Sequence, residues 1–245
     1  MTLTKRIVIL VIVVFLMTIS SAFAQNYELK LLNNSAYKLP AITGKIWLAP
    51  DNAWTNVYIG PVWISVKNTV TNETWVQRML CVDPMGRIYP NQTWNATLSS
   101  GIPSAAINQA AWDRAVYIAN NNYGWDTTEG GWNANQLAAI QISVWETLMD
   151  STFNLGVGNF KLNSTVNGGD RTTIANLAQG FYNDSQLING YASQYSWFSA
   201  TTNGQDMYFI PVPSPTNNVV PEIPAFALAP MGLAAFGLIR RKINR

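Results

Sequence analysis

The chain has 245 residues, and its 15 Lys and Arg against 13 Asp and Glu give a formal net charge of +2. It contains no His and a single Cys, which excludes Ser-His-Asp and Cys-His nucleophile systems, zinc sites built on imidazole, Cys-ligated clusters and an internal disulfide. The small charge supplies no basic field for nucleic acid, so we expect no nucleic-acid partner, no metal site and no other cofactor.

Residues 1–24 have the three parts of a cleaved secretory signal peptide. Lys5 and Arg6 form a charged start, an apolar run extends from Ile7 to Met17, and Ala22-Phe23-Ala24 supplies the small residues that signal peptidase requires. An N-terminal membrane anchor is the alternative, but the apolar run is short for a span. We therefore expect an exported protein.

The exported body, residues 25–212, begins with a mainly β part over residues 25–100. Three segments are rich in β-branched and aromatic residues, and turn residues such as Gly60-Pro61 separate them. These predicted strands are Val57–Ile59, Val62–Val66 and Thr74–Val82.

Residues 101–200 are predicted to be mainly helical. Apolar residues at helical spacing predict a helix over Ser104–Asn120, with Ser100 or Ser104 as its cap. Two further helices are predicted over Asn133–Asp150 and Asp170–Tyr182, and residues 205–212 return to strand character. The expected fold class is α+β, with a sandwich-like or barrel-like β-sheet subdomain and a helical subdomain inserted before a closing strand.

The C-terminal end has a linker over residues 213–220 and a tripartite tail over residues 221–245. The tail starts with a short motif, continues with the apolar stretch Ala225–Ile239 and ends in a basic cluster. The motif residues are Pro221, Glu222 and Pro224, and the cluster contains Arg240, Arg241 and Lys242. The apolar stretch is shorter than the roughly 20 residues of a permanent span, and basic residues are retained on the cytoplasmic side.

This tail resembles the PEP-CTERM class of sorting signals, although Pro-Glu-Ile-Pro stands where Pro-Glu-Pro is usual. The resemblance implies a sorting transpeptidase of the exosortase type as a partner and at least transient membrane attachment through the C-terminus. A plain C-terminal membrane anchor is the alternative. Either way we expect the protein at the cell surface, in the envelope or in the extracellular matrix. Residues 25–220 carry nine basic and twelve acidic side chains, a net charge of −3.

Gln141 is an unusual residue in the second predicted helix. It falls on the apolar stripe formed by Leu137, Ile140, Val144, Trp145 and Leu148. A buried amide without a partner costs about 1–3 kcal/mol. The simplest alternative is a glutamine that bonds to a neighbouring backbone.

Cys81 is unpaired in a chain that we expect outside the cell, where a free thiol oxidises unless it is buried or chemically occupied. Burial alone is common for Cys. One reaction would account for Cys81 and Gln141 together: the sulfur attacks the Gln side-chain carbonyl, ammonia leaves, and an intramolecular thioester remains.

The two segments resemble the signature of bacterial thioester domains. Leu80-Cys81-Val82-Asp83 stands at a predicted strand end, and Gln141-Ile142-Ser143-Val144-Trp145 follows sixty positions later on a predicted helix. The resemblance extends over roughly residues 60–215. The chain departs from the family at Ser143, where Ala is preferred, and at Leu80, where an aromatic residue is frequent.

The resemblance implies that the thioester attaches the protein to a partner. An amine or hydroxyl on a surface, host or matrix macromolecule would attack the Gln141 carbonyl, so the reaction is a single-turnover acyl transfer and not enzymatic turnover. Trp145 either shields the bond from water or packs in the core. Asp83 either orients the Cys81 strand or begins a turn, and we favour the turn. Ser143 is close enough in sequence to affect the bond.

Non-covalent binding of carbohydrate or exopolysaccharide is the main competing function, and a structural surface protein is another. Aromatic residues in polar, turn-rich sequence suit sugar rings, and the class of sorting tail is associated with extracellular polysaccharide. The aromatic residues that suggest it are Trp94, Tyr123, Trp125 and Trp132. A glycosidase pair is not favoured, because no spacing selects one among Asp126, Glu129, Glu146 and Asp150.

Overall fold

The computed structural model describes residues 26–122, 132–192 and 195–208, all within one compact unit. The predicted signal peptide (1–24), linker (213–220) and sorting segment (221–245) lie outside the described residues. Within the described ranges, every helix is too short or too polar to cross a membrane.

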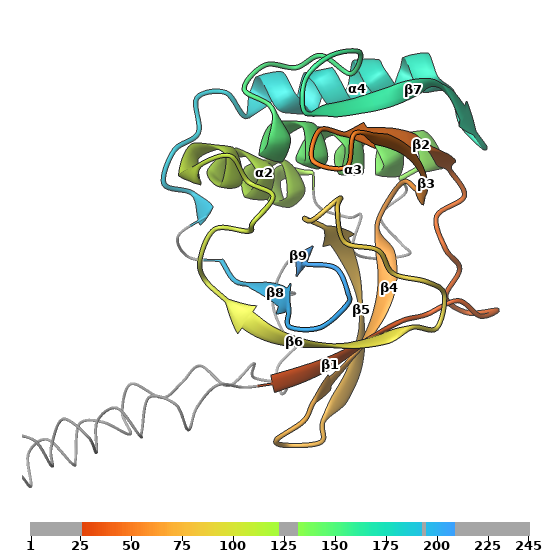
Figure 1. Cartoon of the computed structure of the whole chain (residues 1–245), viewed down its shortest axis with the longest axis vertical. Helices are drawn as coiled ribbons and strands as arrows, with labels where there is room; N and C mark the ends of the chain where they lie inside the picture. The colour runs from red at the N-terminus through yellow and green to blue at the C-terminus, as the bar shows by residue number, and fades with distance from the viewer. Residues whose placement is uncertain (1–25, 123–131, 193–194, 209–245) are drawn as a thin grey trace, which may run out of the picture. The chain divides into compact units, whose positions relative to one another are not determined.

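Six antiparallel strands close into a barrel in the order β1-β4-β5-β9-β8-β6, and β6 pairs back with β1 (Figure 1). In β1, Tyr27, Leu29 and Leu31 alternate with exposed residues and point into the core, as expected for a strand with one buried face. The strands are β1 (Asn26–Leu31), β4 (Val62–Asn68), β5 (Thr74–Cys81), β6 (Thr93–Ser99), β8 (Trp197–Ala200) and β9 (Met207–Tyr208).

A second, three-stranded antiparallel sheet has the order β3-β2-β7. Its strands are β2 (Thr43–Leu48), β3 (Ala53–Tyr58) and β7 (Phe160–Asn167). Gly44, Ile46 and Leu48 on β2 are buried, whereas the alternate positions face outward. The sheet therefore has one face packed on the core and one open face.

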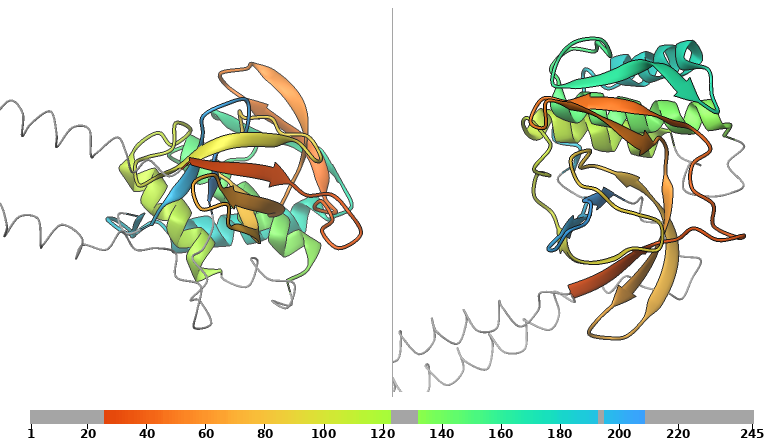
Figure 2. Two further views of the ribbon diagram at one scale, coloured as in Figure 1. Left: turned by 90° about the horizontal axis from the view of Figure 1, so that it is seen from below. Right: turned by 45° about the vertical axis from the view of Figure 1, so that its right-hand side comes forward.

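Three helices lie together at one end of the barrel, with the small sheet beside them (Figures 1 and 2). They are α2 (Gln109–Asn121), α3 (Ala134–Met149) and α4 (Arg171–Asp184). Asn133 and Gln136 form a capping box that starts α3. Every residue of α3 from Ala138 to Met149 is buried, so α3 is the central helix of the molecule.

The predicted α+β class with a barrel-like sheet is confirmed, and the structure corrects the start of the first helix. The N–H of Ile107 donates to the carbonyl of Leu148 and is not available to a helix that starts at Ser104. The side chain of Asn108, instead of Ser100 or Ser104, caps α2 by accepting from the N–H of Ala111. The stretch predicted to be mainly helical also contains the strands β7 and β8.

Candidate functional site

Cys81 is the last residue of β5, and the short strand β9 holds it in place. Its backbone is paired with Met207 of β9, and the N–H of the next residue, Val82, donates to the carbonyl of Asp206 at 2.9 Å. The Cys81 side chain is only 6% exposed. The end of the barrel strand therefore positions the sulfur before the chain turns away.

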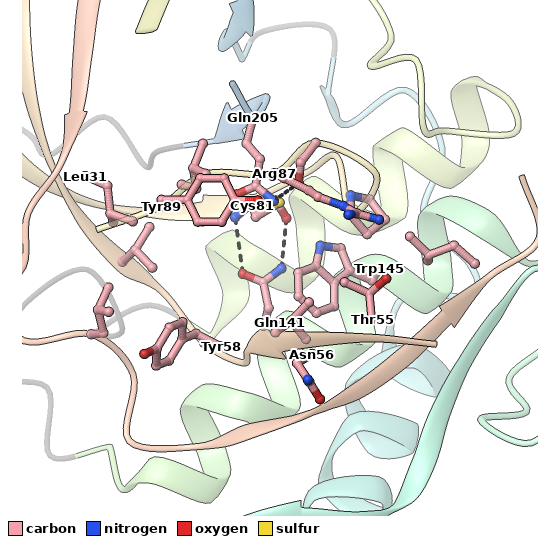
Figure 3. A pocket seen from close by; sticks show the side chains of 18 of the residues that line it. Leu31, Thr55, Asn56, Tyr58, Cys81, Arg87, Tyr89, Gln141, Trp145 and Gln205 are labelled. Carbon is pink, nitrogen blue, oxygen red and sulfur yellow. Dashed lines mark hydrogen bonds between the residues drawn. The ribbon is translucent and has the colours of Figure 1, made fainter. Parts of the chain in front are cut away.

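Gln141 lies on α3 with no exposed surface and points at the backbone of Cys81 (Figure 3). The Cys81 N–H donates to Oε1 of Gln141 at 3.2 Å, and Nε2 of Gln141 donates to the Cys81 carbonyl at 2.8 Å. These two bonds satisfy the buried amide. The fold thus brings together the two residues that the sequence singled out.

The Cys81 thiol is held in its neutral form. Burial raises the pKa of the thiol above its ordinary value, and the nearby Asp83 carboxylate adds to this effect. The Sγ–H group donates to the backbone carbonyl of Asp83 at 3.1 Å. A neutral, buried thiol reacts slowly with solutes from solution.

Trp145 stands one helical turn after Gln141 and lines the same site (Figure 3). Its ring lies 6.0 Å from that of Phe160. The indole N–H is buried, has no partner at hydrogen-bonding geometry among the described residues, and, as a donor near the sulfur, acts to lower the pKa of the Cys81 thiol. Trp145 therefore places an N–H donor near the sulfur.

Asp83 begins the turn that follows Cys81. Its side chain accepts from the N–H of Met85 at 2.9 Å, the pattern of an Asx turn, and burial raises the pKa of its carboxyl. The turn packs tightly, because a Cβ on Gly86 would lie 2.7 Å from the carbonyl oxygen of Gly204. The loop between β8 and β9 thus holds this turn in place.

A cleft of about 600 Å³ opens beside the pair, with Cys81, Gln141 and Trp145 on its wall. Trp54, Tyr58 and Tyr89 also line the cleft and are exposed to solvent. The rim carries an exposed ion pair at 3.6 Å between Arg87 and Asp51. The cleft therefore opens to solvent past aromatic side chains and ends at the buried pair.

The cleft residues on β3 were not identified from the sequence. Trp54, Asn56 and Tyr58 alternate along the strand and face outward. The signal in the sequence is that Trp54 and Tyr58 share one strand face with the polar Asn56. Such a polar face usually points outward, where large aromatic residues are unexpected.

Ser143 is not part of the cleft lining. It lies two positions after Gln141, and residues at that spacing face different sides of a helix. Its Oγ atom is buried and without a hydrogen-bond partner among the described residues. The structure thus places Ser143 in the packing around α3.

The aromatic residues that suggested sugar binding occupy other positions. Trp94 is only 2% exposed and belongs to the core, and Trp132 is half-buried with its ring 6.1 Å from that of Phe181. Tyr123 and Trp125 lie outside the described residues. The expectation that Trp94 presents a face to sugars is therefore wrong, because the Trp94 ring is enclosed by the barrel.

The two candidate glycosidase carboxylates that the structure describes accept hydrogen bonds from backbone N–H groups. Glu146 accepts from the N–H of Asn154, and Asp150 accepts from the N–H groups of Asn159 and Phe160. Asp126 and Glu129 lie outside the described residues. Across the described ranges, no three Cys, Asp or Glu side chains gather as metal ligands.

Comparisons of the chain with protein-family models, with curated protein sequences and with solved structures found no match.

Proposed function

We propose that the protein is an exported, surface-anchored thioester-domain protein. Cys81 and Gln141 would form an internal thioester that attaches the protein, once, to an amine or hydroxyl of a surface, host or matrix macromolecule. In this proposal the barrel is the β subdomain, and α2, α3 and α4 form a helical subdomain inserted before the closing strand β9. Export by residues 1–24 and anchoring by residues 221–245 belong to the same proposal.

The observation that carries the proposal is the paired hydrogen bond between the Gln141 side chain and the Cys81 backbone. It fixes the Gln141 carboxamide against the residue that bears the only thiol of the chain. The pair also lies on the wall of a solvent-accessible cleft. A purely structural glutamine would make the same two bonds to backbone, so it is the thiol on the bonded residue and the adjacent cleft that favour the thioester.

Formation of the bond balances without a further reactant. The Cys81 sulfur adds to the side-chain carbonyl carbon of Gln141, the C–N bond breaks, and the thiol proton leaves with the nitrogen as ammonia. The Cys81 N–H already donates to Oε1, where negative charge develops in the tetrahedral intermediate. A donor of this kind stabilises the oxyanion, as in acyl-transfer enzymes.

Attack by a partner reverses the role of the sulfur. An amine or hydroxyl adds to the same carbon, the C–S bond breaks, and the proton of the nucleophile passes to the sulfur. The Trp145 N–H lies near the sulfur and acts to lower the pKa of the Cys81 thiol, so it is available to stabilise the departing sulfur. Because Cys81 and Gln141 are buried, water has limited access and the thioester is protected from hydrolysis.

Intact mass spectrometry of the purified protein tests the proposal. The wild-type mass should be lower than the sequence mass by one ammonia, and Cys81→Ala and Gln141→Glu should each remove this deficit. Incubation with methylamine should then add one methylamine to wild-type protein, and fragmentation should locate it at Gln141.

The matched control is Gln136→Glu, which changes a glutamine near the start of the same helix and should keep the deficit. A wild-type protein of full mass, whose Cys81 is alkylated by iodoacetamide in denaturant, would refute the thioester.

A further inference from the structure

One part of the open face of the small sheet carries mostly uncharged polar side chains. The register places Thr43 opposite Tyr58 and Lys45 opposite Asn56, and residues directly opposite each other in a sheet share a face. The neighbouring strand β7 adds residues to the same hollow, namely Asn163, Thr165 and Asn167. This face therefore presents amides, hydroxyls and a phenol ring.

These side chains line a hollow of about 670 Å³, which we call the sheet groove. Its lining is Thr43, Gly44, Lys45, Asn56, Val57, Tyr58, Asn163, Thr165 and Asn167. Only Lys45 among them carries a charge. Asn56, Val57 and Tyr58 also line the cleft of Cys81 and Gln141, so the two hollows meet along β3.

Figure 3 shows Asn56 and Tyr58 on the strand that passes beside Gln141. Tyr58 is 48% exposed and offers a free ring at the junction of the two hollows. The nearby Trp47 ring is not free in this way, because the Lys161 ammonium lies 3.7 Å from its centroid.

The lining selects among classes of ligand. One Lys does not suffice for a nucleic-acid backbone, and a lipid requires a larger apolar surface. An added peptide strand would pair with a sheet edge, whereas the groove lies on a sheet face. Uncharged hydrogen-bonding side chains beside an exposed ring suit the hydroxyls and the apolar face of a neutral sugar.

We propose that the sheet groove binds a neutral polysaccharide and presents one of its hydroxyls to the thioester. This inference names the acceptor and rests on the proposed function. The hydroxyl oxygen bonds to the Gln141 carbonyl carbon, the C–S bond breaks, and the hydroxyl proton passes to the Cys81 sulfur. The product is a sugar ester of the glutamyl side chain left at position 141, whose nitrogen has already departed as ammonia, and a free thiol at Cys81.

Binding is measured first in a Cys81→Ala background, where no thioester can form. The probes are linear oligosaccharides of glucose, of mannose and of galactose. Their binding is measured by titration calorimetry or by nuclear magnetic resonance. At least one probe should bind, and Tyr58→Ala and Asn56→Ala should each weaken its binding about tenfold, the effect of roughly 1.4 kcal/mol.

Trp75→Ala is the matched control, because Trp75 is 38% exposed on the barrel strand β5 and lines neither hollow. It should leave binding unchanged. Failure of every probe to bind overturns the inference. Equal binding by Tyr58→Ala, or binding of a proline-rich peptide in place of the sugars, overturns it as well.

The second measurement uses wild-type protein with the oligosaccharide that binds. Its mass should increase by one oligosaccharide at Gln141, and hydroxylamine should release the sugar because it cleaves esters. A protein that shows the ammonia deficit and binds the sugar without forming this adduct overturns the acceptor role alone. Absence of the deficit refutes the proposed function, whereas the Cys81→Ala measurement still decides whether the groove binds sugar.

Discussion

The backbone of Cys81 holds both polar atoms of the Gln141 side chain, with its N–H on Oε1 at 3.2 Å and its carbonyl on Nε2 at 2.8 Å. The two residues are sixty positions apart in the sequence. A covalent bond between them would therefore close a long loop of the chain, with a measurable effect on stability.

We predict that opening the proposed thioester lowers the melting temperature of the protein. A cross-link across a loop of this length removes conformational entropy from the unfolded chain and is worth about 4 kcal/mol on the chain-entropy model. Methylamine should therefore lower the melting temperature of wild-type protein by roughly 5–15 °C, measured by calorimetry. Cys81→Ala treated in the same way should not change, and an unaltered wild-type melting temperature after complete modification contradicts the prediction.

Trp145→Phe should slow the reaction of the thioester with methylamine. The substitution keeps an aromatic wall but removes the indole N–H that lies near the sulfur. Loss of a hydrogen bond worth about 1.4 kcal/mol to the departing sulfur slows the step about tenfold. The rate of adduct formation is followed by mass spectrometry, with Trp63→Phe as the control. Equal rates for Trp145→Phe and wild type would assign Trp145 to packing alone.

Gly86→Ala should disturb the site while the rest of the fold persists. The new Cβ would meet the Gly204 carbonyl oxygen at 2.7 Å and the Gln205 side chain at 2.8 Å, so the turn after Cys81 must move away from the β8–β9 loop. We expect a loss of about 1–3 kcal/mol in the free energy of unfolding and a smaller fraction of molecules with the ammonia deficit.

Gly180→Ala provides the opposite control for this prediction. Gly180 lies within α4, and a Cβ there meets no atom within 4 Å. Replacement of an exposed helical glycine by alanine should stabilise the protein by about 0.5–1 kcal/mol and leave the deficit unchanged. Chemical denaturation and intact mass measure both quantities, and an unchanged deficit in Gly86→Ala would show that the turn does not position Cys81.

Glu146 should make the protein less stable as the pH rises. Burial raises the pKa of its carboxyl from 4.5 to about 8, and Asp150 adds to this effect. The folded state binds the Glu146 proton more tightly than the unfolded state. The contribution of Glu146 to the free energy of unfolding is therefore fully present below about pH 4.5 and is lost as the pH rises towards 8. The expected loss is about 3–5 kcal/mol over this range.

Glu146→Gln should remove this dependence, since an amide can still accept from the N–H of Asn154 at the position of Oε1. The variant should therefore lose less free energy of unfolding between pH 5 and pH 8 than the wild type, and burial of Asp206, which raises the pKa of its carboxyl to about 6, accounts for part of the remaining loss. Glu28→Gln, at an exposed position of β1, should keep the wild-type slope. The same slope in Glu146→Gln would show that Glu146 is not its source.

Much of the secondary structure follows from local patterns in the sequence. The predicted second helix over Asn133–Asp150 matches α3 closely, because Asn133 and Gln136 supply both halves of a capping box. No strand is predicted from the sequence over Phe160–Asn167, where the structure has β7. In β7, Phe160 and Leu162 are buried and their neighbours are less buried, which is the alternation of a strand. The helix α2 begins at Gln109, later than the predicted start at Ser104, because the Ile107 N–H donates to the distant carbonyl of Leu148.

The apolar stripe of α3 identified Gln141 as a buried amide, but it predicted less burial of the helix than the structure shows. A stripe predicts a helix with one buried face, whereas α3 is buried on all sides after Leu137. This difference arises because α2, α4 and the small sheet pack around α3, and no local pattern specifies those neighbours.

The sequence by itself determined which residues were chemically out of place: a lone thiol in a chain with a predicted export signal, and an amide on an apolar stripe. Composition and periodicity are local properties, so they reveal such residues without the fold. The tertiary structure alone decided that Cys81 and Gln141 meet, and that the open face of β3 leads to them. Both relationships depend on closing the barrel and packing α3 against its end, where contacts form between segments that are distant in the sequence.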